Sequence, residues 1–233
     1  MYGISTEISS VYKNILNFFM NKMLNYFLKF ILLYHINISA STLKSMDKLR
    51  KHIEEITPVT DKEFDYIKTF FKEKRVLKHQ YLIQEGDKVI CEYWIMKGIF
   101  RAFYMDKDGK EHILQFALEN WWLSDYNAFF NQTESKINII CMEDAEVVCL
   151  SLFAREQLAS ELHKMEHFFR MKLTKGYSAQ QRRIISLLSD NPKQRYEEFA
   201  CLYPTIMQKI PKKYIAEYLG VSRETLSRLY TVR

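Results

Sequence analysis

Residues 212–233 read KKYIAEYLGVSRETLSRLYTVR, which predicts two short helices around a tight turn. Gly220 stands where the first helix must end, because a left-handed backbone conformation is cheap only for glycine. Two residues later, the Ser222 hydroxyl can accept the backbone N–H of Thr225 and so cap a second helix. Ala216 is small enough to let that helix cross closely. The apolar residues fall where a helix-turn-helix buries its core, namely at Ile215, Leu219, Val221, Leu226 and Leu229. The stretch is therefore a predicted helix-turn-helix.

The second predicted helix keeps a polar outer face. Its outward positions are left for base edges and phosphates: Arg223, Glu224, Ser227 and Arg228. A plain helical hairpin could share the apolar spacing, but it does not need this combination of small, capping and charged residues. The pattern indicates that the chain binds double-stranded DNA.

Composition and charge agree with a globular DNA-binding protein. The 233 residues are 48% hydrophobic and 27% charged, with a net charge of +6 that suits nucleic acid. The cysteines show no metal-ligand spacing, which predicts buried, reduced thiols in a cytoplasmic protein, and they are Cys91, Cys141, Cys149 and Cys201. We expect neither a metal nor a cofactor.

The first 45 residues differ in composition from the rest. Residues 15–36 are long enough to span a bilayer, but Lys22 and Lys29 interrupt the run. Residues 1–45 are interpreted first as the product of a start codon assigned too far upstream, with Met46 opening the protein proper. An amphipathic membrane-surface helix is the alternative.

Residues 46–155 are predicted to form an effector-binding domain of short antiparallel strands after N-terminal helices. Alternating runs include Tyr93–Met96 and Ile113–Phe116, and Asp108-Gly109 is a strong hairpin signal. In the helical part of the domain, Thr60 to Glu63 fits a capping box.

Residues 156–190 are predicted to form one long helix that connects the domains. Its apolar stripe is equally compatible with intramolecular packing and with a dimer seam, and consists of Leu158, Leu162, Met165, Phe169, Leu173 and Tyr177. Asn191-Pro192 should end this helix. Residues 191–233 then form the DNA-binding domain, in which Pro204 and Pro211 bracket a connector.

This order of elements resembles the Crp/Fnr family of transcription regulators over about Lys48 to Leu229. The motifs that carry the resemblance are Glu85-Gly86-Asp87, Tyr93-Trp94-Ile95-Met96-Lys97-Gly98 with Arg101, Asp108-Gly109-Lys110-Glu111 and the terminal Val221 to Arg228. The resemblance implies an α+β fold with a cyclic-nucleotide-binding-like antiparallel β-roll, a long dimerisation helix and a C-terminal helix-turn-helix. It also implies a homodimer on a two-fold symmetric DNA site, with RNA polymerase as a further partner.

The resemblance also assigns roles within the predicted DNA-reading helix. Arg223, Glu224 and Arg228 become the base readers, since arginine grips guanine in bidentate fashion and glutamate accepts from cytosine. The alternative that Glu224 only orients Arg228 stays open. Phosphate contact and positioning fall to Lys212, Lys213, Ser222, Thr225 and Ser227.

The effector site is where the sequence departs from the family. Cyclic-nucleotide-binding members carry a Gly-Glu pair for the ribose and an Arg-Ser or Arg-Thr pair for the phosphate. Residues 120–126 and 134–137 read NWWLSDY and ESKI instead, so cyclic AMP is not expected as effector. Another small molecule could use a pocket built from Trp121, Trp122, Ser124, Asp125, Tyr126 and Lys136. Alternatively, the aromatic rings simply close the roll.

Two other classes of protein are alternatives to a DNA-binding regulator. A cupin-type small-molecule-binding or enzymatic roll would need a cluster of histidines, yet the predicted roll holds only His79 and His112. A membrane-tethered signalling protein would depend on residues 1–45. Nothing in the sequence indicates catalysis.

Overall fold

The computed structural model describes residues 46–231. The interpretations of residues 1–45 therefore lie outside the described residues. Within residues 46–231, no helix is both long enough and apolar enough to cross a membrane.

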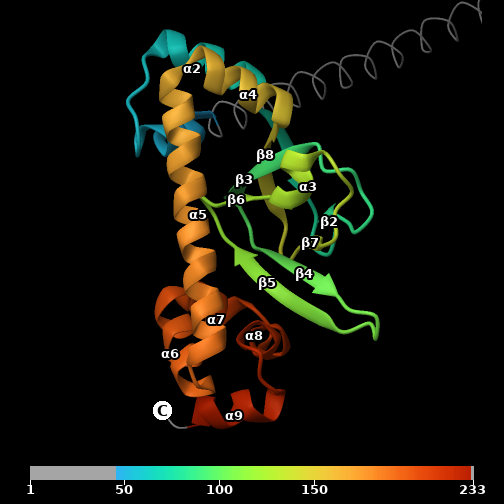
Figure 1. Cartoon of the computed structure of the whole chain (residues 1–233). Helices are drawn as coiled ribbons and strands as arrows, with labels where there is room; N and C mark the ends of the chain where they lie inside the picture. Colours follow the sequence, from blue (N-terminus) through green and yellow to red (C-terminus); the bar gives the residue numbers. More distant parts are fainter. Residues whose placement is uncertain (1–45, 232–233) are drawn as a thin grey trace, which may run out of the picture. The chain divides into compact units, whose positions relative to one another are not determined.

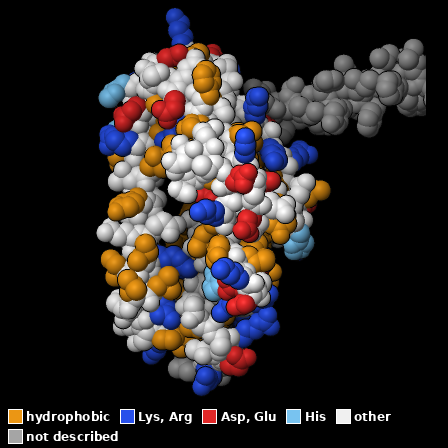
Figure 2. All heavy atoms as spheres, turned by 45° about the vertical axis from the view of Figure 1, so that its right-hand side comes forward, with side chains coloured by type: hydrophobic (Ala, Val, Ile, Leu, Met, Phe, Trp, Pro, Cys, Tyr) orange, Lys and Arg blue, Asp and Glu red, His pale blue; other side chains and the backbone are white. Residues whose placement is uncertain are grey.

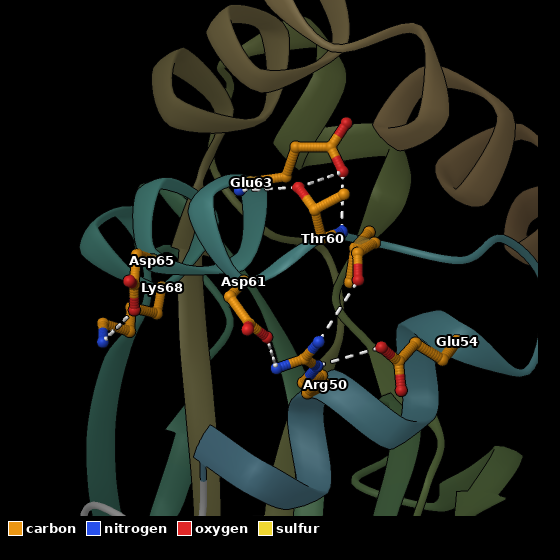
Figure 3. A network of polar contacts seen from close by, with 8 residues as sticks. Arg50, Glu54, Thr60, Asp61, Glu63, Asp65 and Lys68 are labelled. Atoms are coloured by element: carbon orange, nitrogen blue, oxygen red, sulfur yellow. Dashed lines mark hydrogen bonds and ion pairs between the residues drawn. The ribbon is translucent and has the colours of Figure 1, made fainter.

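The described chain begins with helical residues 46–54, followed by α2 (Asp61–Ile67) and a 3₁₀ turn (Lys68–Phe70). The predicted capping box is confirmed: the Thr60 side chain accepts from the Glu63 backbone N–H, and the Glu63 carboxylate accepts from the Thr60 N–H at 2.7 Å. Arg50 ties the first helix to this cap (Figure 3), donating to Glu54 at 2.9 Å and to Asp61 at 2.7 Å. The two helices are thus joined by polar contacts as well as by packing.

In the described residues, eight strands form two sheets. The strands pair in antiparallel fashion, as the sequence predicts (Figure 1). One sheet has the order β1-β8-β3-β6, and its strands are β1 (Lys72–Val76), β8 (Ala145–Ser151), β3 (Cys91–Lys97) and β6 (Trp122–Leu123). The other has the order β2-β7-β4-β5, and its strands are β2 (Tyr81–Ile83), β7 (Asn138–Cys141), β4 (Phe100–Met105) and β5 (Glu111–Ala117). The short helix α3 (Tyr126–Asn131) lies between β6 and β7 in the chain. Apolar side chains between the sheets, among them Ile95, Phe100 and Val147, form the core of the roll.

The long predicted helix is divided in two. Leu162 has an extended backbone (φ −125°, ψ 98°), so α4 (Leu152–Glu161) ends and α5 (His163–Ser189) begins there. The predicted stripe is therefore broken, with Leu158 on α4 and Met165 on α5, both buried. Tyr177 at the far end of the stripe is 70% exposed, so the stripe packs inside the protein at its start but not at its end.

Four helices complete the described chain: α6 (Pro192–Leu202), α7 (Pro204–Lys209), α8 (Lys212–Leu219) and α9 (Arg223–Thr231). The predicted break at Asn191-Pro192 is confirmed, and Asn191 caps α6. The connector between Pro204 and Pro211 is itself helical, because proline is well tolerated in the first turn of a helix.

Of the cysteines, Cys141 is buried, Cys91 and Cys149 are half-buried, and Cys201 is exposed, so burial was wrongly predicted for Cys201.

Gly98 makes the tight turn between β3 and β4. Its φ is +110°, and a Cβ placed there would lie 2.5 Å from the Ala145 Cβ. Both the backbone conformation and the space therefore require glycine.

We predict that Gly98→Ala lowers the free energy of unfolding by about 3 kcal/mol, because strain and overlap add. Gly109→Ala is the matched control: Gly109 also has a positive φ (+76°), but a Cβ there would meet no described atom within 4 Å, so the cost should be about 1 kcal/mol. Urea unfolding of the two variants measures both values. Equal losses would show that steric overlap at Gly98 contributes nothing.

His52 is a buried histidine that the fold keeps neutral. Its ring is 2% exposed and stacks on Trp94 at 4.9 Å, while its Nε2 accepts from the Trp122 indole N–H at 3.2 Å. Burial lowers the pKa of His52 from 6.5 to about 3, and the charges of Lys172 and Lys175 act in the same direction. The folded protein therefore binds fewer protons here than the unfolded chain below pH 6.5.

Stability should consequently fall as the pH drops below 6.5, and this single group should contribute a loss of about 2 kcal/mol between pH 7 and pH 5. His52→Gln can still accept the Trp122 indole N–H, but the glutamine does not titrate. Between pH 7 and pH 5, the unfolding free energy of this variant should therefore fall by about 2 kcal/mol less than that of the parent protein. Urea titrations of both proteins at the two pH values test this difference. Identical pH dependence would contradict a neutral buried His52.

Candidate DNA-binding surface and effector cavity

The predicted helix-turn-helix is present in α8 and α9. Gly220 has φ +66° and ψ 36°, and its N–H closes the last turn of α8. The Ser222 hydroxyl accepts the Thr225 N–H at 3.1 Å, which caps α9 as expected. Ile215, Ala216 and Leu226 are buried between the helices. The turn, the cap and the core therefore hold α9 at a fixed angle to α8.

The three predicted base readers, Arg223, Glu224 and Arg228, are all exposed on α9. The pKa of Glu224 is lowered by hydrogen bonds from its own backbone N–H and from Ser222, and the charges of Arg223 and Arg228 add to the effect. Glu224 is thus held as an anion beside two cations. This face offers both donors and an acceptor to a groove.

The predicted positioning residues surround this face. Lys212, Lys213 and Ser227 are exposed, and Lys213 lies 3.8 Å from Glu217 one helical turn on. Ser222 and Thr225 hold each other, with 3.2 Å between their hydroxyl oxygens. Their first role in this structure is therefore to cap α9.

Helices α6 and α8 pack on the outer face of the β4–β5 hairpin, and α9 packs on α8 (Figure 1). Phe116 on β5 contacts Phe199 of α6 and Tyr218 of α8, with ring centroids 6.2 and 5.4 Å apart. Phe103 and Ile113 are buried in the same cluster. An apolar contact thus joins the roll directly to the predicted DNA-binding helices.

Arg183 of α5 forms the polar centre of this junction. Its Nη2 donates to the carbonyl oxygen of Ile113 on β5 at 2.9 Å and to that of Tyr218 on α8 at 3.0 Å. The Arg183 guanidinium also lies 3.5 Å from the centroid of the Tyr218 ring. Burial lowers the pKa of Arg183. One side chain therefore ties together the long helix, the roll and the helix-turn-helix.

A second junction pairs β4 and β5 with α8. Arg101 forms a bidentate ion pair with Glu111 at 2.5 and 3.0 Å, and its guanidinium lies 4.2 Å from the Tyr214 ring centroid. Glu217 of α8 is half-buried nearby, and desolvation, together with repulsion from Glu111, raises its pKa. Arg101, singled out in the sequence as part of a motif, thus contributes to docking.

A cavity of about 720 Å³, here called the central cavity, lies between the roll, α5 and the C-terminal helices. Of the predicted effector residues, Trp121, Trp122 and Tyr126 line it. In Figure 2 the surface is hollowed beside the roll, with lysine or arginine side chains near the opening. The cavity has the size of a small-molecule site.

The other predicted effector residues lie elsewhere. Ser124 is buried and donates to the Cys91 carbonyl oxygen at 3.0 Å. Asp125 is also buried, and its carboxylate accepts from the Ala128 N–H at 3.2 Å, the Ser135 hydroxyl at 2.9 Å and the Lys136 N–H at 3.3 Å. The Asp125 carboxylate therefore caps the first turn of α3 and ties it to the segment before β7. Lys136 borders a separate shallow hollow with Lys88 and Glu134.

Sequence reasoning missed a buried ion pair in the wall of the central cavity. Arg155 of α4 donates to Glu92 of β3 at 2.7 Å, and both side chains are less than 10% exposed. Burial raises the pKa of Glu92, while Arg155 opposes the shift. Arg155 also lies 4.1 Å from the Phe169 ring centroid. No local motif marks this pair, because its partners are 63 residues apart.

Among residues 46–231, no group of three histidine, cysteine or carboxylate side chains is placed to hold a metal ion. His112 pairs with Asp106 at 2.6 Å on the β4–β5 hairpin. The described roll thus offers no histidine cluster of the kind a cupin-type site would use.

We predict that Arg183→Met lowers the free energy of unfolding by about 2 kcal/mol, because two hydrogen bonds from a charged donor are lost. Arg182→Met is the matched control: Arg182 is its exposed neighbour on α5, so its loss should stay within about 0.5 kcal/mol. Urea unfolding compares the two variants. Equal stabilities of the two variants would contradict a stabilising role of Arg183 at the junction.

The chain shares sequence features with one protein family and its fold with several solved structures. The family profile described as cyclic nucleotide-binding domain matches residues 73–161. No curated protein matches the chain in sequence.

Three of the solved structures illustrate the shared fold. FixK2 from Bradyrhizobium japonicum is 16% identical with a TM-score of 0.60, and the match covers 69% of this chain and 83% of FixK2. The c-di-GMP-responsive global regulator CLP of Xanthomonas campestris is 14% identical with a TM-score of 0.58, covering 74% of this chain and 90% of CLP. A protein from Eubacterium rectale, described as a Crp/Fnr-family transcriptional regulator, is 14% identical with a TM-score of 0.58, covering 73% and 82%.

The family profile matches the roll and α4, whereas the three solved structures match 69–74% of the chain and so extend beyond the roll. Residues 73–161 thus resemble cyclic nucleotide-binding domains in sequence, and the described chain shares its fold with the solved structures named above.

Proposed function

We propose that this protein is a DNA-binding transcription regulator of the Crp/Fnr type. The observation that carries the proposal is the exposed face of α9, where Arg223, Glu224 and Arg228 stand on a helix fixed by the α8 core and the Ser222 cap. Such a helix enters the major groove by its N-terminal half, where these side chains reach base edges. Lys212, Lys213 and the hydroxyls of α9 then contact phosphates.

The regulator acts as a homodimer on a two-fold symmetric site. Tyr177, Ile184 and Leu188 support this part of the proposal, because they follow each other along α5 at intervals of seven and four residues. They are 70%, 57% and 83% exposed, which is unusual for large apolar side chains unless a partner covers them. A parallel pair of α5 helices joined along this strip places two α9 helices on one DNA duplex.

The effector of this regulator is a molecule other than cyclic AMP. The Asp125 carboxylate accepts the Ala128 N–H in the first turn of α3 and the Lys136 N–H before β7, so a cyclic phosphate there would meet a negative charge. Arg155 in the wall of the central cavity is already paired with Glu92. Lys88 and Lys136 border this place in the described chain, but a lysine does not offer the bidentate fork with which an arginine grips a cyclic phosphate.

The protein acts through DNA, with RNA polymerase as a further partner, rather than as an enzyme. We place it in the cytoplasm, where its DNA would be. The cupin-like alternative is not favoured, since the histidines of the described roll do not gather into a site.

Selection of bound sequences from a random DNA pool, followed by binding titrations on the selected site, tests the proposal. Arg223→Ala or Arg228→Ala should cost about 1–3 kcal/mol of discrimination between the selected site and a site with one changed base pair. Lys213→Ala should instead weaken all sequences alike and reduce the salt slope by about 1.

Arg75→Ala is the matched control, because it removes an exposed arginine from β1 in the roll. It should leave both affinity and discrimination within about twofold of the parent protein, since surface charges far from the helix-turn-helix contribute little. Recovery of no preferred sequence, or discrimination unchanged by Arg223→Ala and Arg228→Ala, would contradict the proposal.

A further inference from the structure

The walls of the central cavity come from both halves of the proposed regulator. Phe116 and Trp121 belong to the roll, while Tyr203 and Tyr218 belong to the C-terminal helices. The rings of Trp121 and Tyr203 lie 5.9 Å apart at 65°, and those of Phe116 and Tyr218 lie 5.4 Å apart. Aromatic walls of this kind favour a planar ring system, which gains from stacked and edge-to-face contacts.

The charge of the lining is strongly positive. Six cationic side chains stand against the two carboxylates of Glu92 and Glu198, and the cations are Arg155, Lys172, Lys175, Arg182, Arg183 and Arg195. Glu92 is paired with Arg155, and Glu198 accepts from Ser186 at 3.2 Å. An excess of cations therefore remains for an anion.

Not all these cations are available to a ligand. Arg183 and Arg195 donate to backbone carbonyl oxygens, and Lys172 lies 3.5 Å from Glu55. Lys175 and Arg182 are exposed on α5 and form no ion pair with a carboxylate of the described chain. These two side chains can turn towards an acidic group at the edge of the cavity.

Gly176 lies in the middle of α5 and lines the cavity. Glycine inside a helix costs about 1 kcal/mol relative to alanine. Here no packing contact requires it, since a Cβ at Gly176 would meet no described atom within 4 Å. What the missing side chain gives is open volume in the cavity.

We propose that the central cavity binds a small organic anion with a planar aromatic body. The rings lie against Trp121, Tyr203 and Phe116, and the acidic group faces Lys175 and Arg182. Because such a ligand touches the roll and the C-terminal helices at once, it stabilises their docked arrangement. Only the regulatory meaning of this docking rests on the proposed function; the binding itself does not.

Fluorescence titration of the full chain with 8-anilinonaphthalene-1-sulfonate, an aromatic anion, tests the site without DNA. Gly176→Phe fills the cavity and should weaken binding at least about tenfold. Gly176→Ala is the matched control: it also removes the helix glycine but adds only a methyl group, so binding should stay within about twofold. Circular dichroism checks that both variants fold. Absence of saturable binding, or equal binding by Gly176→Phe and the parent protein, would overturn the proposal.

A second comparison tests the charge. The double variant Lys175→Gln/Arg182→Gln should bind the anionic probe at least about fivefold more weakly, but should bind its neutral analogue N-phenyl-1-naphthylamine within about twofold of the parent. The control variant Lys107→Gln/Lys110→Gln removes two exposed lysines from the β4–β5 turn and should change neither affinity. Equal loss of both probes in the first variant would overturn the assignment of an anion.

Hydrogen exchange tests the bridging. At saturating 8-anilinonaphthalene-1-sulfonate, amides of α6 and α8 should exchange more slowly in the parent protein and in Gly176→Ala, but not in Gly176→Phe. Slowing confined to the roll would overturn the bridging role. Failure of the protein to select DNA would leave these results untouched, so the two proposals can fail separately.

Discussion

The β4–β5 hairpin is the constraint on which the rest of the structure depends, because it must be covered on both faces. One face supplies Phe100 and Ala102 to the roll core, and the other supplies Phe103 and Phe116 to the C-terminal helices. A sheet of this kind usually leaves one face to solvent. Here the second apolar face draws α6 to α8 onto the roll, and Arg183 and Arg101 fix the contact with charged hydrogen bonds and ring contacts.

Features that depend on a few neighbouring residues could be predicted from the sequence. The Thr60 capping box, the Gly220 turn and the Ser222 cap all rest on contacts within three or four residues, and each is found as expected. The antiparallel strands and the hairpin at Gly109 also follow from local alternation and turn chemistry. For the same reason, α9 and its exposed face could be predicted nearly to the residue.

Features that depend on distant partners could not be predicted. Strand β1 is almost wholly polar, and it is a strand because it pairs with β8, which lies far along the chain. The break at Leu162 lies within one continuous apolar stripe, so periodicity alone does not mark it. Glu92 and Arg155 are far apart in the sequence, so no local pattern predicts that they pair. Asp125 was predicted as an effector contact, but its carboxylate accepts three hydrogen bonds within the roll. Periodicity in the sequence predicts helices and strands, whereas the candidate site depends on how these helices and strands are arranged in space.

The Asp125 carboxylate competes with any diffusible phosphate for the hydrogen-bond donors around it. A group attached to the chain and held at its acceptors has an effective concentration in roughly the millimolar range or above. A diffusible phosphate at micromolar levels would have to displace this carboxylate from Ala128, Ser135 and Lys136. In the proposed regulator, the chain's own carboxylate therefore organises the α3 segment without a bound phosphate.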